Sequence, residues 1–166
     1  MGFPLGGLAA RVVGPINAFG PALLGGGLAG AVIGLAQWLV LRRYLERVGW
    51  WAPATAAGMS IGTAVGSALV GYGTEIRELV VQGAATGTAV GALQALVLRR
   101  SIPGAAAWAL ANAVLWPLGW LVTARIGVDV EAQYTNFGSS GALVVTALSG
   151  LLLSRLIGRR GAHLAR

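Results

Sequence analysis

The spacing of charged residues constrains this chain more than any other feature. Five stretches contain no Asp, Glu, Lys or Arg: residues 12–41, 48–74, 79–98, 101–124 and 132–154, which by subtraction hold 30, 27, 20, 24 and 23 residues. A helix needs about 20 such residues to cross the roughly 30 Å hydrocarbon core of a bilayer. The spacing therefore predicts an integral membrane protein with five spanning helices.

Composition agrees with this interpretation. Of the 166 residues, 56% are hydrophobic and 10% are charged, whereas an average soluble domain has about 25% charged residues. We expect an all-α bundle with helices at about 21–41, 50–72, 79–98, 103–124 and 138–157, forming a single transmembrane domain over residues 21–166. Residues 1–20 are too polar to span easily, and we interpret them as a short interfacial or re-entrant segment, or as a partly disordered terminus.

A motif recurs at an offset of 57 residues. In each copy three glycines at four-residue spacing precede a glutamine and a pair of arginines; the copies are Gly26, Gly30, Gly34, Gln37, Arg42 and Arg43, then Gly83, Gly87, Gly91, Gln94, Arg99 and Arg100. Trp51 maps onto Trp108 at the same offset. The pattern predicts a duplicated helix hairpin, with repeat 1 at about 25–73, repeat 2 at about 82–124 and a partial third copy at about 138–160.

Small residues four apart lie on one face of a helix and let two backbones approach closely in lipid. The candidate packing positions are Gly26, Gly30, Gly34, Gly58, Gly62, Gly66, Gly83, Gly87, Gly91 and Gly150. One interpretation is that these glycines pack the chain against itself. The other is that some of them bind a partner protein.

Two glutamines and one asparagine lie inside the predicted helices. Gln37 and Gln94 each come five residues before an arginine pair, and Asn112 lies within the fourth helix. A buried amide needs partners, because an unpaired one costs a few kcal/mol in hydrocarbon. We expect hydrogen bonds between helices, with a polar cavity for a small ligand or ion as the alternative.

The arginines predict the orientation. If five helices span the membrane, nine of the twelve arginines lie on the same side of it. By the positive-inside rule that side is cytoplasmic, so we expect the C-terminus inside and the N-terminus outside. The simplest role for Arg42, Arg43, Arg99 and Arg100 is to fix this topology; the alternative is a lipid-headgroup pocket between the two pairs. An aromatic belt at the membrane surface is the expected role of Trp50, Trp51, Trp108, Trp116 and Trp120.

Several kinds of chemistry have no residues to support them. The chain has no cysteine and no lysine, and His163 is its only histidine. Thiolate sites, multi-histidine metal sites, classical catalytic triads and lysine-containing phosphate loops are therefore excluded. The net charge of +7 comes from arginines near helix ends, so we expect no nucleic-acid binding. We expect no catalytic, cofactor or metal site, and thus no enzyme.

The string from Gly30 to Arg43, followed by a tryptophan-led helix, resembles small bacterial multi-pass membrane proteins with repeated GxxxGxxQWLVLRR helix pairs, mostly uncharacterised. The resemblance covers about residues 25–157, although Ala95 replaces the tryptophan in the second unit. It implies a protein of the bacterial inner (plasma) membrane.

We expect membrane lipids and other membrane protein subunits as partners. The expected function is that of a packing or accessory subunit in a larger membrane complex. The alternative is a transport element for a small molecule, ion or lipid, with its pathway between the repeats.

Overall fold

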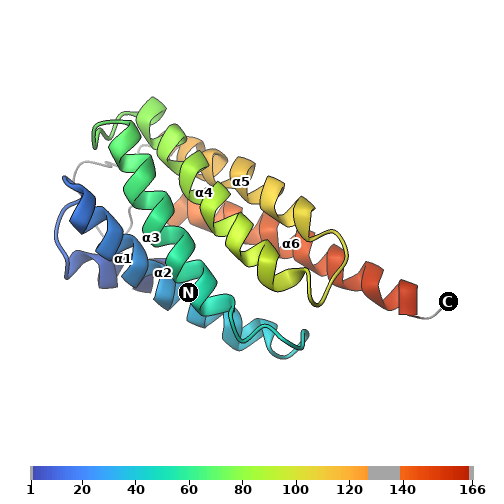
Figure 1. Cartoon of the computed structure of the whole chain (residues 1–166). Helices are drawn as coiled ribbons and strands as arrows, with labels where there is room; N and C mark the ends of the chain where they lie inside the picture. The colour runs from blue at the N-terminus through green and yellow to red at the C-terminus, as the bar shows by residue number, and fades with distance from the viewer. Residues whose placement is uncertain (1, 127–138, 165–166) are drawn as a thin grey trace.

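The structure is a computed structural model that describes residues 2–126 and 139–164, and every regular element in these ranges is an α-helix (Figure 1). The six helices are α1 (Gly2–Arg11), α2 (Phe19–Leu41), α3 (Trp51–Leu69), α4 (Ile76–Leu98), α5 (Ala105–Arg125) and α6 (Ser139–Leu164). The predicted all-α fold is confirmed. The helix ends follow local signals: α2 and α4 end immediately before an arginine pair, and α5 follows Gly104, whose φ of 82° is left-handed.

Within the described residues, four helices are long and apolar enough to cross a membrane. They are Phe19–Leu41, Ile76–Leu98, Ala105–Arg125 and the Gly141–Gly158 part of α6. The chain is therefore membrane-embedded. The predicted second span corresponds to α3, which is absent from this set because Gly, Ala, Ser and Thr make up most of its 19 residues and lower its mean hydropathy.

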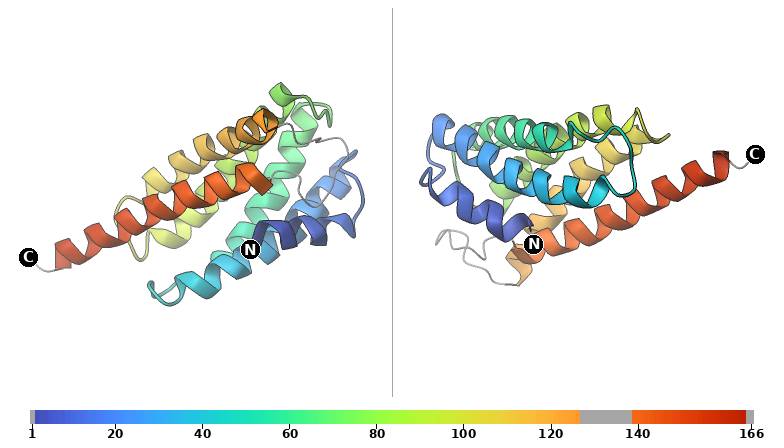
Figure 2. Two further views of the ribbon diagram at one scale, coloured as in Figure 1. Left: turned by 180° about the vertical axis from the view of Figure 1, so that it is seen from behind. Right: turned by 90° about the horizontal axis from the view of Figure 1, so that it is seen from below.

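Each helix packs against the next one along the chain, from α1 to α6. Helix α1 also touches α6, so the first and last helices are in contact as well. Figure 1 shows α3 and α4 side by side in front of α5 and α6, and Figure 2 shows the same bundle from behind and from below. In both figures the C-terminal part of α6 projects beyond the other helices.

Glycines form the contact surfaces between successive helices. A Cβ added to Gly30 of α2 would lie 2.8 Å from the Thr55 carbonyl oxygen of α3, and one added to Gly62 would lie 2.6 Å from the Thr86 Cα of α4. One added to Gly91 of α4 would lie 2.9 Å from the Ala109 carbonyl oxygen of α5. These distances to backbone atoms are too short for any side chain, so glycine is required for the observed helix separation. The other glycines of α2, α3 and α4 whose added Cβ would lie within 3.0 Å of an atom of the next helix are Gly26, Gly34, Gly58, Gly66, Gly83 and Gly87.

Gly150 differs from this set, and the expectation that it packs within the chain is not met. A Cβ added there would meet no atom within 4 Å, because Gly150 lies on the exposed face of α6. Helix α6 instead approaches α5 at Gly141, where an added Cβ would collide with the Gly119 carbonyl oxygen. The small residue that brings α6 close to its neighbour is therefore at the start of the helix.

The N-terminal segment contributes the ten-residue helix α1, which lies along α2. Gly6 of α1 is buried, and a Cβ added to it would lie 3.0 Å from the Ala29 carbonyl oxygen and from the Ile33 side chain. Helix α2 begins eight residues after α1 ends. Residues 2–11 are thus folded onto the bundle.

The larger hydrophobic core lies at the end of the bundle where the arginine pairs follow α2 and α4. It contains side chains from five helices and two connections: Leu41, Leu45, Val48, Trp51, Val97, Leu98, Ile102, Ala105, Trp108, Leu153 and Leu156. A smaller cluster of Ala29, Ile33, Met59 and Val90 lies further along α2, α3 and α4. The larger core surrounds the polar residues described next.

Candidate functional site

The two predicted glutamines are brought together near the arginine-rich end of the bundle. Gln37 and Gln94 each lie four residues before the last residue of their helix, α2 and α4 respectively. Gln94 is 2% exposed, whereas Gln37 is half-buried. The Gln94 side-chain amide donates a long hydrogen bond of 3.5 Å to Gln37 Oε1. The two glutamines are therefore joined directly across α2 and α4.

A tryptophan from the following helix donates to each glutamine. The Trp51 indole Nε1 donates to Gln37 Oε1 over 2.9 Å, and the Trp108 Nε1 donates to Gln94 Oε1 over 3.0 Å. Both bonds connect residues 14 positions apart. The Trp51 and Trp108 rings lie 5.8 Å apart between centroids and are tilted by 55°, a geometry typical of aromatic pairs.

These two tryptophans do not form the predicted membrane-surface belt. Trp51 is 1% exposed and Trp108 is 5% exposed, while Trp50 is 68% exposed and can occupy the interface. Trp116 and Trp120 are half-buried against α4, where they face Gly87 and Gly83. The indole N–H of Trp51 or Trp108 is satisfied by a glutamine inside the bundle, so it does not need water.

Thr55 of α3 is a member of this cluster that the sequence did not single out. Its hydroxyl accepts a 2.8 Å hydrogen bond from Gln94 Nε2 and donates to the Trp51 carbonyl oxygen at 2.8 Å. One signal could have found it, because Thr55 lies 57 residues before Asn112. That is the same offset that relates Gln37 to Gln94.

Asn112, the third predicted polar residue, contacts neither glutamine through a hydrogen bond in the described structure. Its Nδ2 donates to the Trp108 carbonyl oxygen at 2.9 Å, and its Oδ1 accepts from Trp116 Nε1 at 3.3 Å. Asn112 thus occupies in α5 the place of Thr55 in α3, one turn after a tryptophan. It extends the polar cluster through Trp108.

The buried polar atoms of the cluster are all hydrogen-bonded. Among the described residues, no buried side-chain nitrogen or oxygen lacks a partner. The members are amides, hydroxyls and indoles, none of which titrates near neutral pH. The described residues also contain no group of three His, Cys, Asp or Glu side chains able to hold a metal ion. The arrangement is suited to holding helices together, since every buried polar atom of the cluster has a partner inside the protein.

The arginine pairs have separate environments. The Arg42 guanidinium lies over the Trp38 ring, 5.0 Å from its centroid, which is within range of a cation–π interaction. Arg99 and Arg100 line a cavity beside α3, and neither Arg42 nor Arg43 is among the residues lining that cavity. The structure thus does not bring the two pairs together around this cavity.

No family model, curated protein or solved structure matches the chain at a significant level.

Proposed function

We propose that this protein is a non-enzymatic, membrane-embedded accessory subunit that packs against another membrane protein. The observation that carries the proposal is a stripe of small residues on the exposed face of α6. Four-residue spacing relates Thr146, Gly150, Ser154 and Gly158, and all four are exposed. In lipid, such a stripe is typical of a helix that packs closely against another helix.

The contrast with the other glycine stripes supports this role. On α2, α3 and α4 each stripe is covered by the next helix of the chain. A Cβ added to any of these glycines would lie 3.2 Å or less from a backbone atom of that helix. At Gly150 and Gly158 an added Cβ would meet nothing within 4 Å. A large apolar side chain would serve equally well against lipid tails, as Leu143 and Leu151 do on the same helix. Small exposed residues are therefore better explained by a helix of another chain.

We also propose that five helices span the membrane, with α3 as the fifth. Helix α3 contains 19 residues and no charged side chain, so at 1.5 Å per residue it is close to the thickness of the hydrocarbon core. It packs between α2 and α4, each of which is long and apolar enough to span. In that position its polar and small residues face neighbouring helices, and its low hydropathy carries little cost.

The helix pairs α2–α3 and α4–α5 are proposed to have arisen by duplication, with α6 as a partial third copy. Supporting this, Trp51 and Trp108 make the same hydrogen bond to Gln37 and Gln94. Under the positive-inside rule we place the end that carries Arg42, Arg99 and Arg155 in the cytoplasm of a bacterial cell. Membership of the small bacterial multi-pass proteins with the repeated GxxxGxxQWLVLRR motif is part of the same proposal.

Affinity purification from native membranes in mild detergent tests the accessory role. We expect Gly150→Leu to reduce recovery of the partner by about fivefold or more, since overpacking an interface by about 1 to 3 kcal/mol lowers the binding constant about 5- to 150-fold. The matched control is Gly20→Leu, because Gly20 is also helical and exposed and has no neighbour within 4 Å of an added Cβ. Equal recovery with Gly150→Leu and Gly20→Leu would contradict an interface on α6.

The transport alternative, with a pathway near Gln37, Gln94 and Asn112, lacks a supporting observation. Gln94 and Asn112 are buried and hydrogen-bonded to residues of the chain. We therefore retain the accessory role as the single proposed function.

A further inference from the structure

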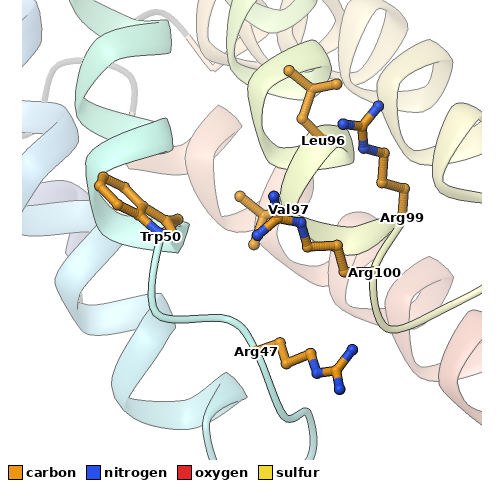
Figure 3. A pocket seen from close by; sticks show the side chains of 6 residues that line it. All are labelled: Arg47, Trp50, Leu96, Val97, Arg99 and Arg100. Atoms are coloured by element: carbon orange, nitrogen blue, oxygen red, sulfur yellow. The ribbon is translucent and has the colours of Figure 1, made fainter.

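A cavity of about 340 Å³ lies at the arginine-rich end of the bundle, between the start of α3 and the end of α4. Six residues line it: Arg47, Trp50, Leu96, Val97, Arg99 and Arg100. Figure 3 shows Trp50 on the α3 side, Leu96 and Val97 on α4, and Arg47 in the connection before α3. The Arg100 side chain lies beside Val97 on the side of α4 that faces Trp50. The lining thus combines three cations with an apolar wall.

The three guanidinium groups have no counter-charge within the described residues. The ion pair found there joins Arg77 and Glu75, near the opposite end of α4. No acidic side chain lines the cavity. Glu46 is the acidic residue nearest to Arg47 in sequence, and it forms no ion pair in the described structure. Three arginines that line one cavity without a carboxylate favour an anionic ligand, and a guanidinium group matches phosphate oxygens in a bidentate geometry.

The connection that carries Arg47 is held next to the end of α4. The Ser101 hydroxyl donates a 2.7 Å hydrogen bond to the Glu46 carbonyl oxygen, which ties the α2–α3 connection to the α4–α5 connection. Arg47 itself has a φ of 60°, a left-handed conformation that costs a non-glycine residue about 1 to 2 kcal/mol. These two features hold the backbone of Arg47 beside the end of α4, and its side chain lines the same cavity as Arg99 and Arg100.

The apolar side of the cavity favours a lipid over a free anion as the ligand. Trp50 is 68% exposed and Leu96 is 49% exposed, so both present apolar surface beside the cations. Tryptophan is enriched at the depth of lipid headgroups, and Leu96 belongs to a helix that is apolar enough to span the membrane. A soluble phosphate ion would use only the arginines, whereas a phospholipid would use the arginines for its phosphate and the apolar wall for the start of its acyl chains.

We propose that this cavity binds the headgroup of an anionic phospholipid, with Arg47, Arg99 and Arg100 attracting its phosphate and with its glycerol and upper acyl chains against Trp50, Leu96 and Val97. The binding site differs from the one expected from the sequence, because Arg47 takes the place of Arg42 and Arg43. This proposed lipid site is also independent of the proposed protein partner, because that partner would bind α6 and the cavity lies between α3 and α4.

Native mass spectrometry of the delipidated full-length protein can test this site. The probes are phosphatidylglycerol and phosphatidylcholine added separately to the detergent-solubilised protein. We expect one tightly bound phosphatidylglycerol and weaker binding of phosphatidylcholine. The double variant Arg99→Gln/Arg100→Gln should weaken phosphatidylglycerol binding about thirtyfold, because each arginine near an anionic headgroup contributes about fivefold.

The matched control is Arg42→Gln/Arg43→Gln, which removes the same charge at the end of α2 but leaves the cavity lining intact. It should keep the affinity within about fivefold of the original, since its effect is limited to general attraction at the surface. A melting temperature equal to that of the unmodified protein shows that each variant is folded. If Arg99→Gln/Arg100→Gln does not fold, Arg47→Gln provides a milder single change in the same cavity lining.

Two results would overturn the proposal. One is an equal loss of phosphatidylglycerol by both double variants, which would mean that only overall charge matters. The other is full competition by millimolar inorganic phosphate together with equal binding of the two lipids, which would identify a site for a free anion.

Discussion

Gln94 offers the sharpest test of how the bundle is held together. The change Gln94→Leu keeps the volume of the side chain roughly constant and removes three hydrogen bonds, to Trp108, Thr55 and Gln37. Thr55 retains its bond to the Trp51 carbonyl oxygen. Trp108, which is 5% exposed, loses the acceptor for its indole N–H. The substitution therefore leaves one buried donor without a partner.

The magnitude follows from these bonds. Hydrogen bonds between helices in membranes contribute about 0.6 to 2 kcal/mol each, and an unsatisfied buried donor costs about 1 to 3 kcal/mol. We expect Gln94→Leu to lower the free energy of unfolding by about 2 to 3 kcal/mol. The matched change Gln37→Leu should lower it by about 2 kcal/mol, because it leaves the indole N–H of Trp51, which is 1% exposed, without its acceptor.

Unfolding in mixed micelles with increasing dodecyl sulfate, followed by circular dichroism, measures these free energies. The double variant Gln94→Leu/Trp108→Phe should cost about 1 kcal/mol less than the sum of the single changes, since it removes donor and acceptor together. The reasoning is refuted if Gln94→Leu unfolds within about 0.5 kcal/mol of the unmodified protein, or if the double variant shows no coupling.

Other contacts give further predictions. Gly30→Leu and Gly87→Leu should abolish folding or strongly lower the melting temperature in detergent, because an added Cβ meets backbone atoms of the next helix; Gly20→Leu should not, and unchanged melting of all three would refute the close packing. Glu78→Ala removes the carboxylate that accepts a hydrogen bond from the Glu75 backbone N–H in the capping box of α4. It should speed hydrogen exchange in the first turn of α4, at a cost of about 1 kcal/mol.

Helices α2 to α5 could be predicted closely because charge spacing reflects a physical limit on each span, whereas α6 continues past the expected end at about 157 to Leu164, through Arg155. For example, Arg42 and Arg99 directly follow the last residues of α2 and α4. The glycine stripes predicted close contacts but not the neighbour in each contact. Gly91 and Gly150 belong to similar stripes, yet Gly91 faces α5 and Gly150 faces outward. Which helix covers a stripe depends on the order of packing, and spacing alone does not encode it.

The polar cluster was only partly predictable. The sequence identifies Gln37 and Gln94 because an amide is costly in hydrocarbon, but it predicts a position at the membrane surface for Trp51 and Trp108. That assignment was wrong because each indole N–H finds a glutamine inside the bundle. Thr55 was not singled out, since a threonine in a helix can satisfy its hydroxyl with its own backbone, as Thr55 does with Trp51. Its additional role as the acceptor for Gln94 depends on the α3–α4 contact.

The mass of the particle extracted from native membranes in mild detergent tests the accessory role most directly. The proposal predicts a complex in which this 16.8 kDa chain is joined by a different membrane protein, and predicts that Gly150→Leu releases the chain from it. Recovery of the unmodified protein only as a lone chain, or only as multiples of its own mass, would contradict the account.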